Sequence, residues 1–289
     1  ESHADIYKFL VAKDWHRKGI PGTNHTVWDA KVADSNYRAP LDMTNISVNY
    51  DETLVQRSEA DNLDPRSVWM INCYQAMKTG EPGFSFNMYD QNTETLRNAC
   101  TEVTSSHDSD VCNLGSGNIG ELESIEEFKS IAEIASKFLY CGSLGSTLPY
   151  EKVEQVRAIN MRQGLGLMGM HEWLLRRGEQ YEVTAELHQW LAAYKTHSEI
   201  GANAQADKAG LPRPVAYRAI APTGSIGILA GTTTGIEPLF AVAYLRRYLV
   251  NATDWESRYV VDSTAEHIIK ATGCDPDTID TAYRLADDP

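Results

Sequence analysis

Hydrophobic residues in the first third of the chain follow two spacings, one of three to four residues and one of two residues. The first is typical of helices and the second of half-buried strands. Asp64 before Pro65 is a typical helix start, and the polar stretch 19–40, rich in Gly, Pro and Asn, predicts a long loop. The spacings predict helices over 3–14 and 64–78 and strands over 44–50 and 84–86.

The remainder of the chain also alternates helical patterns with short apolar runs. Ser124 followed by Glu127 forms a capping box at the start of one helix. We predict helices over 124–138, 149–160, 165–177, 184–208, 253–271 and 277–286, and strands over 216–221 and 241–250. Strands that alternate with helices predict an α/β fold with a parallel or mixed sheet.

A short polar run combines an amide, a thiol and a carboxylate at alternate positions: Asn98-Ala99-Cys100-Thr101-Glu102. We expect this run to be extended, and side chains at alternate positions of an extended segment point to one side. A second thiol, Cys112, follows in a stretch of Gly, Asn and Ser. Accessible loop thiols are typical of reactive cysteines. The set therefore indicates sulfur redox or radical chemistry, although a buried Cys beside a surface Glu remains the alternative.

The segment 219–227 carries a short apolar run into a turn, Pro222-Thr223-Gly224-Ser225, followed by Ile226. Gly224 lets a ligand approach the backbone, the hydroxyls add donors, and N–H groups after such a turn can bind an anion. A phosphate cradle without the Walker lysine is one interpretation. A helix cap after a strand is the other.

Two further motifs have local explanations. Residues 164–169 fit the dinucleotide fingerprint G-x-G-x-x-G, but we predict helix on both sides, so tight helix packing accounts better for these glycines. In the run 232–238, Glu237 either orients a neighbouring loop or caps a helix.

Composition excludes several function classes. The net charge of −14 argues against a surface for nucleic acid, and no apolar run is long enough for a membrane span. Five irregularly spaced cysteines without C-x-x-C do not predict a disulfide framework or a zinc site. None of the eight histidines is spaced from another His or a Cys as a metal ligand would be, so we predict no metal site.

In order, these segments resemble the catalytic subunit of ribonucleotide reductase. Residues 2–9 resemble its His-Pro-Asp-Ile helix, with Ala4 in place of the proline, and 80–83 lead into its finger loop. The other matching segments are Asn45-Ile46-Ser47-Val48, Asn98-Ala99-Cys100-Thr101-Glu102, Cys112-Asn113-Leu114-Gly115-Ser116, Ala221-Pro222-Thr223-Gly224-Ser225-Ile226 and Gly235-Ile236-Glu237-Pro238.

The resemblance implies part of a ten-stranded α/β barrel with a central finger loop that carries the active-site cysteine. Residues 1–289 would be a partial barrel domain, with the N-terminal part and the C-terminal end missing, and the fragment alone would be inactive. The short spacing of Cys100 and Cys112 and the run 219–248 resemble the adenosylcobalamin-dependent class II branch. A class I large subunit, which needs a separate radical-generating subunit, and a non-catalytic nucleotide-binding homologue are the alternatives. A thiol oxidoreductase unrelated to nucleotides would explain the thiols but not the turn.

The resemblance also implies a role for each matching residue in reducing the 2′-hydroxyl of ribonucleotides, diphosphates by preference. Cys100 would become the thiyl radical, Glu102 the general base on the 3′-hydroxyl, and Asn98 would hold the sugar. Cys112 would supply reducing equivalents with a partner cysteine absent from this sequence. The substrate phosphates would bind at Pro222, Thr223, Gly224, Ser225 and Ile226. Cys73, Cys141 and Cys274 match no family cysteine and are expected to be structural.

The implied cofactor is adenosylcobalamin, with a thiol reductant such as thioredoxin for turnover. The implied partners are the ribonucleotide substrate and nucleotide effectors bound mainly by missing segments, and the resemblance allows a homodimer. Neither membrane nor nucleic acid is an expected partner, and the expected location is the cytoplasm.

Overall fold

The computed structural model describes residues 3–34, 36–51, 65–88, 94–239, 241–250, 254–263, 265–266, 270 and 273. The chain divides into two compact units. The first comprises Glu1–Ser106 with Arg247–Glu256, and the second His107–Arg246 with Ser257–Pro289. Cys274 and the predicted helix 277–286 lie outside the described residues.

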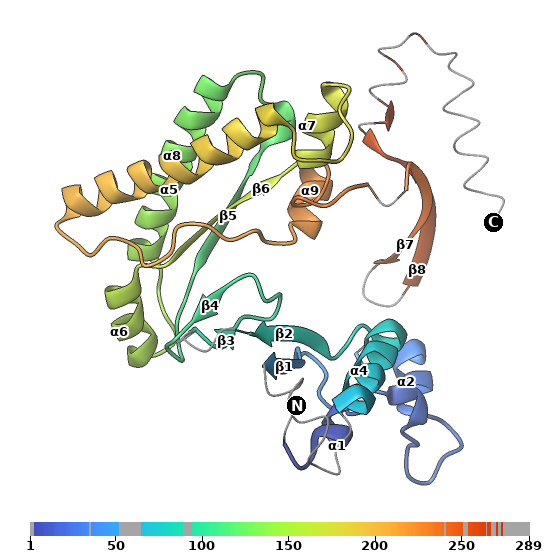
Figure 1. Cartoon of the computed structure of the whole chain (residues 1–289). Coiled ribbons are helices and arrows are strands. Elements are labelled where there is room, and N and C mark those ends of the chain that lie inside the picture. The colour runs from blue at the N-terminus through green and yellow to red at the C-terminus, as the bar shows by residue number, and fades with distance from the viewer. Residues whose placement is uncertain are drawn as a thin grey trace. The chain divides into compact units, whose positions relative to one another are not determined.

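The first unit contains a parallel pair of strands joined through a helix (Figure 1). The pairing runs from Ser47 opposite Gly83 to Asp51 opposite Asn87. Its elements up to residue 87 are α1 (Ile6–Leu10), a 3₁₀ helix (Trp15–Arg17), α2 (Val27–Ala33), β1 (Ser47–Asp51), α4 (Pro65–Thr79) and β2 (Gly83–Asn87). The two strands and α4 confirm their predictions, whereas α1 is shorter than its predicted helix.

Helix α2 lies inside the stretch predicted as a loop, so that prediction was wrong. The Thr26 hydroxyl accepts from the Asp29 N–H at 3.2 Å, and the Asp29 carboxylate accepts from the Thr26 N–H at 2.7 Å. This reciprocal capping box starts a helix despite the polar surroundings.

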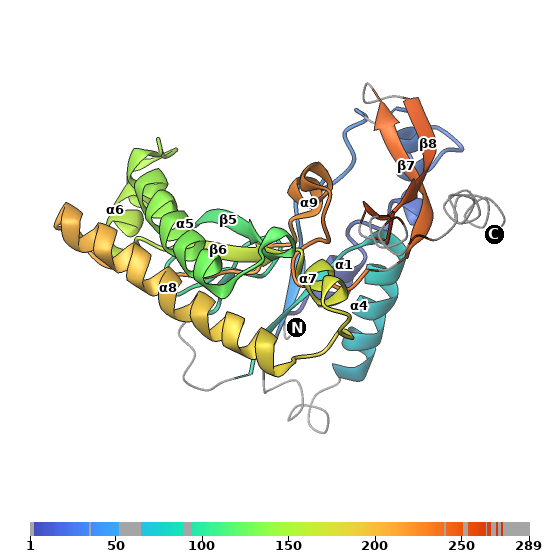
Figure 2. The same ribbon diagram turned by 90° about the horizontal axis from the view of Figure 1, so that it is seen from above.

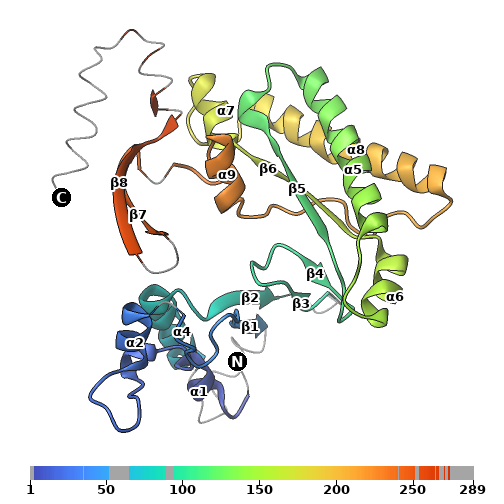
Figure 3. The same cartoon turned by 180° about the vertical axis from the view of Figure 1, so that it is seen from behind.

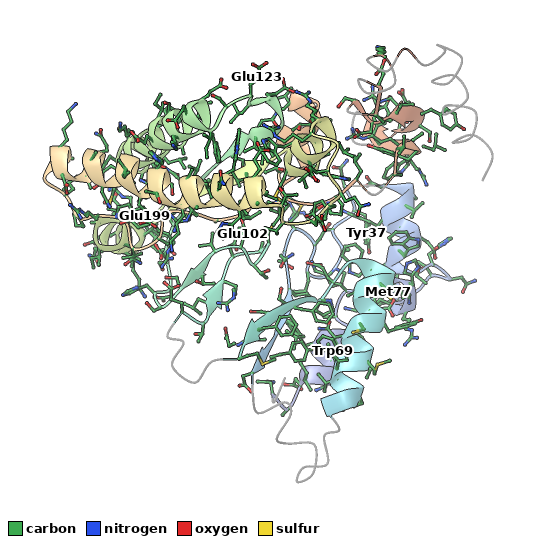
Figure 4. All side chains as sticks on the ribbon, turned by 45° about the horizontal axis from the view of Figure 1, so that its top comes forward. Tyr37, Trp69, Met77, Glu102, Glu123 and Glu199 are labelled. Carbon is green, nitrogen blue, oxygen red and sulfur yellow. The ribbon has the colours of Figure 1, made fainter. Side chains whose placement is uncertain are left out.

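An aromatic cluster forms the core of the first unit. Tyr50 of β1 is fully buried, and its ring lies 5.2 Å from that of Trp69 on α4, which Figure 4 labels. Phe84 of β2 lies 5.1 Å from Trp69 between ring centroids. Burying these rings between α4 and the strand pair fixes the position of β2.

The second unit places two long helices on a second parallel strand pair. Its pairing runs from Asn113 opposite Gln163 to Asn118 opposite Met168. The elements are β5 (Asn113–Asn118), a 3₁₀ helix (Ile119–Glu121), α5 (Ile125–Gly145), α6 (Glu151–Asn160), β6 (Gln163–Met168), α7 (Met170–Arg176), α8 (Ala185–Ala209) and α9 (Gly224–Ala230). These elements confirm the predicted α/β class.

Helices α5 and α8 lie side by side (Figures 1 and 2). A Cβ at Gly201 of α8 would lie 2.3 Å from the Glu133 carbonyl oxygen of α5, so this glycine permits the close contact. Leu139 of α5 packs on β5 at Gly115, which places α5 over one face of the sheet. The buried core residues are Ile119, Leu122, Phe128, Ala132, Leu139, Leu165, Leu167, Met170, Trp173, Leu174, Leu187, Trp190 and Tyr194.

Two predicted helices are wrong in part. Residues 163–168 form strand β6, and the helix there, α7, starts only at Met170. All six residues of β6 are buried, and a fully buried strand shows no alternation that would separate it from a helix. Residues 254–261 form β8 (Asp254–Val261), which pairs with β7 (Ala243–Val250), as Figure 3 shows.

The predicted strand 216–221 is reduced to a short backbone pairing beside β6. The Gln163 N–H donates to the Ala216 carbonyl at 2.9 Å, and the Leu165 N–H donates to that of Tyr217 at 3.1 Å. Within the described part of the chain, no helix combines the length and the apolar character needed to cross a bilayer.

Candidate functional site

Asn98, Cys100 and Glu102 lie on the hairpin that joins β3 (Leu96–Arg97) to β4 (Thr104–Ser105). The Asn98 Oδ1 atom accepts from the Val103 N–H at 3.1 Å, and the Asn98 carbonyl accepts from the Thr101 N–H at 3.1 Å. Thr101 has φ +65°, which turns the chain back on itself. The prediction of an extended segment here was therefore wrong.

The hairpin turn gives the three side chains different environments. Asn98 and Cys100 are exposed. Glu102, labelled in Figure 4, is half-buried, and its Oε2 atom is buried without a hydrogen-bond partner among the described residues. A buried carboxylate oxygen without a partner is unfavourable. It is also available to accept a hydrogen bond from a hydroxyl that enters the site.

The hairpin is anchored to the end of β2 by Arg97. Its guanidinium donates to the Phe86 carbonyl at 3.0 Å and to the Asn87 Oδ1 atom at 2.7 Å. The Thr104 hydroxyl donates to the Glu94 carboxylate at 2.6 Å, which closes the base of the hairpin. The aromatic core thus positions the exposed Cys100 thiol through β2 and Arg97.

Cys112 directly precedes β5 in the second unit and is half-buried. A buried ion pair fixes this end of the sheet: the Asp110 carboxylate accepts from the Arg162 Nε at 2.8 Å, with both side chains at most 6% exposed. Sequence analysis did not identify this pair, because its members are far apart in the sequence. Cys100 and Cys112 belong to different units, so their convergence on one sugar stays a prediction.

The turn before α9 exposes Pro222, Gly224, Ser225 and Ile226, whereas Thr223 is buried. The Thr223 carbonyl accepts from the Gly227 N–H at 2.7 Å, so the N–H groups of residues 224–226 are the first of the helix and have no intrahelical acceptor. The Thr223 hydroxyl accepts from the Gly235 N–H at 2.7 Å. The Thr223 hydroxyl therefore joins the turn to the run 232–238. Helix α9 begins directly after Thr223, as the interpretation of this segment as a helix cap expected.

The run 232–238 is held by residues that sequence reasoning missed. The Thr232 hydroxyl lies 2.5 Å from the Glu172 Oε2 atom and 3.2 Å from the Asn118 Oδ1 atom. Arg176 donates to the other Glu172 oxygen at 2.5 Å, and Glu172 is only 2% exposed. The spacing of Glu172 and Arg176 by four residues was the only sign of this cluster in the sequence, because Thr232 is distant in the sequence. Glu237 bonds locally, accepting from the Thr234 hydroxyl at 3.4 Å.

His171 and Tyr181 hold the end of the same run. The His171 Nδ1 atom accepts from the Leu239 N–H at 2.8 Å, and Tyr181 donates to the Ile236 carbonyl. Burial lowers the pKa of His171 below its ordinary value of 6.5, against an opposing effect of Asp262. The neutral imidazole is therefore the form that the folded loop needs.

Acidification is expected to release Leu239 from His171. Because the pKa of His171 is lower in the folded than in the unfolded state, the unfolded state binds more protons. The stabilisation of the folded loop by neutral His171 is therefore complete above pH 6.5 and is lost as the pH falls through the folded pKa. Hydrogen exchange of peptides spanning residues 235–239 would show the protection declining over that range. His171→Asn keeps an acceptor near Nδ1 without titrating there, and equal pH dependence in both proteins would contradict the assignment.

Among the described residues, no three His, Cys, Asp or Glu side chains are grouped as metal ligands would be.

Comparisons with known proteins give consistent matches. The family model described as ribonucleotide reductase, barrel domain, matches residues 2–194 and 181–285. A vitamin B12-dependent ribonucleoside-diphosphate reductase of Thermoplasma acidophilum is 25% identical over 86% of this chain and 36% of its own length. A protein of the same name from Mycobacterium tuberculosis is 27% identical over 85% of this chain and 39% of its own.

A further relative and two solved structures extend the comparison. A putative adenosylcobalamin-dependent ribonucleoside-triphosphate reductase of Mycobacterium phage D29 is 27% identical over 73% of this chain and 33% of its own length. The class Id ribonucleotide reductase alpha subunit of Actinobacillus ureae superposes with a TM-score of 0.63 at 18% identity, covering 87% of this chain and 51% of that one. A B12-dependent class II ribonucleotide reductase superposes with a TM-score of 0.57 at 15% identity, covering 71% of this chain and 32% of that one.

Proposed function

This chain belongs to the ribonucleotide reductase barrel-domain family, and we propose that its full-length gene product reduces ribonucleotides to deoxyribonucleotides with a thiyl radical at Cys100. The chain spans 36% of the Thermoplasma relative, about a third, so the activity is a proposal about the whole protein. The observation that carries it is an exposed thiol on a hairpin that also holds a buried carboxylate oxygen, Glu102 Oε2, with no hydrogen-bond partner among the described residues.

The first half of the proposed reaction concerns the 3′ position of the sugar. The Cys100 sulfur, as a thiyl radical, takes the 3′ hydrogen of the sugar. Because the S–H bond that forms is weak, the sulfur can return this hydrogen to the 3′ carbon at the end of the reaction. Glu102 accepts the proton of the 3′-hydroxyl, which suits its unpartnered Oε2 atom. The Asn98 Oδ1 atom already accepts from Val103, so its NH₂ group is the part that would donate to the sugar.

The second half reduces the 2′ position. The C2′–O bond breaks and the hydroxyl leaves as water, while Cys112 and a second cysteine thiol each give up a hydrogen and form an S–S bond. The substrate phosphates would accept from the N–H groups of residues 224–226, with Pro222 and Thr223 shaping the turn. The buried Thr223 hydroxyl contributes by fixing the turn to Gly235.

The proposed radical source is adenosylcobalamin. An exposed sulfur on a turn fits a bulky cofactor, and Cys100 is exposed on the turn between β3 and β4. Homolysis of a cobalt–carbon bond is the chemistry that this cofactor supplies when bound. The B12-dependent relatives favour class II, whereas the fold itself is shared with class Id and so leaves the class I alternative open.

We propose nucleoside diphosphates as substrates, as the names of the Thermoplasma and Mycobacterium relatives suggest, although the phage relative is named for triphosphates. A dithiol reductant of the thioredoxin type would reopen the disulfide after each turnover. Effector nucleotides bound mainly outside this chain, a homodimeric state and a cytoplasmic location complete the proposal.

The test is an assay of the full-length protein with cytidine diphosphate, dithiothreitol and adenosylcobalamin. We expect deoxycytidine diphosphate to form only when the cofactor is present, with triphosphate as the matched comparison. Product that requires a second protein subunit but no cobalamin would establish the class I alternative. Nucleotide binding without product under either condition would leave the non-catalytic homologue.

A further inference from the structure

Gly164 of β6 lies directly against the sulfur of Cys112. A Cβ at this position would lie 3.0 Å from the Cys112 Sγ atom, 2.4 Å from Leu114 Cδ2 and 3.1 Å from the Ala219 Cβ atom. The first two contacts come from β5 and its preceding residue, and the third comes from the segment that pairs with β6 on the other side. The sulfur therefore occupies space that a side chain at position 164 would fill.

The backbone does not explain the glycine. Gly164 lies inside a regular parallel pairing, opposite Leu114, and its φ is not in the left-handed region. Glycine weakens a strand interior and is usual there only where another group approaches closely. Here the close groups are the Leu114 methyl, which is the nearest, and the Cys112 thiol on the β5 side, with the Ala219 methyl on the other side.

The second glycine of the same motif has a different neighbour. A Cβ at Gly166 would lie 2.7 Å from the Ala219 carbonyl oxygen and 2.8 Å from the Ser116 Oγ atom. Gly166 thus permits the segment 216–219 to pack on β6 and does not touch Cys112. Both glycines lie in a strand, so the sequence-based account of these residues as helix packing was wrong.

We propose that Gly164 is a positioning residue for the redox thiol: its missing side chain keeps open the space in which the Cys112 sulfur turns to meet a second thiol. This inference rests on the proposed function of Cys112. In the step concerned, two thiols lose two hydrogens to the substrate, an S–S bond forms and the 2′-hydroxyl departs as water. The attacking sulfur must align with the sulfur that it meets, so a methyl group beside it obstructs the step.

Gly164→Ala in the full-length protein tests the proposal. We expect kcat for deoxynucleotide formation to fall on the order of 10²-fold, the loss that misplacing a reacting group by about 1 Å can cause, while KM stays unchanged. Exchange of Cys112 with Ellman's reagent, followed by mass spectrometry of its peptide, should also slow. This second readout needs no nucleotide, so it decides the role of Gly164 even if the full-length protein makes no deoxynucleotide.

Two neighbouring glycines provide matched controls. Gly117→Ala places a methyl on β5 with nothing within 4 Å, so Cys112 exchange should equal that of the unsubstituted protein. Gly166→Ala disturbs the packing of β6 without reaching the sulfur, so it should lower the melting temperature and leave the exchange rate unchanged. Slowing by Gly166→Ala as large as that by Gly164→Ala would overturn the proposal, because a general distortion of the sheet would then suffice.

The Leu114 contact needs its own control, since it is the closest. The double variant Gly164→Ala with Leu114→Ala removes the clash with Cδ2 and retains the contact with sulfur. We expect this variant to fold and to keep the slow exchange, and it carries the test if Gly164→Ala alone does not fold. Exchange at the unsubstituted rate in either Gly164 variant would overturn the proposal.

Discussion

Cys100→Ser in the full-length protein is expected to abolish deoxynucleotide formation while nucleotide still binds. The exposed thiol at the hairpin tip is replaced by a hydroxyl of similar size, whose O–H bond is too strong to exchange hydrogen with the 3′ carbon. Turnover should fall to the uncatalysed background, a loss on the order of 10⁶-fold or more. Product chromatography and nucleotide titration would measure the two quantities separately.

Cys141 provides the matched control for this variant, because it is exposed on α5 and the resemblance implies no catalytic role for it. Cys141→Ser should therefore retain turnover. Deoxynucleotide formation by Cys100→Ser at more than the background rate would reject a thiyl radical at this position, although not membership of the family.

A second large effect is expected for Cys112→Ser. The 3′ hydrogen can still be taken by Cys100, but the pair of thiols that gives up two hydrogens to reduce the 2′ position, and forms a disulfide in doing so, is incomplete. The sugar should then decompose, so free base accumulates and no deoxynucleotide appears. Chromatography of the bases and of the nucleotides would separate this outcome from a protein that is inactive from the start.

Cys73 is the comparison residue here, since its side chain on α4 is half-buried like that of Cys112. Cys73→Ser should turn over repeatedly, with no release of free base. Repeated turnover by Cys112→Ser would contradict its redox role and would remove the basis for proposing that Gly164 positions it.

The candidate chemistry was identified from the sequence although its local geometry was predicted incorrectly. The alternation argument placed Asn98, Cys100 and Glu102 on one side of an extended segment. Instead the chain reverses, because Thr101 adopts φ +65° and Asn98 bonds across the turn to Val103. The order of residues was enough to identify the family, which the comparisons confirm. The direction of the side chains depended on the backbone conformation of Thr101, which β-branched residues rarely adopt.

The positions of the glycines show a second limit of sequence reasoning. Residues 165–168 were predicted as part of a helix, because β6 is buried on both faces and shows no alternation that would mark it as a strand. The reason for glycine at position 164 became visible only when β5 brought Cys112 beside it.

The sequence by itself determined the α/β class, the family and the helices with strong local signals, such as α4 and the Ser124 cap of α5. Those features depend on interactions within a few residues, which spacing and capping side chains encode directly. The tertiary structure decided which distant groups meet: Asp110 with Arg162, Glu172 with Thr232, and Gly164 with the Cys112 sulfur. Such contacts depend on strand register and helix packing, and no local pattern specifies them.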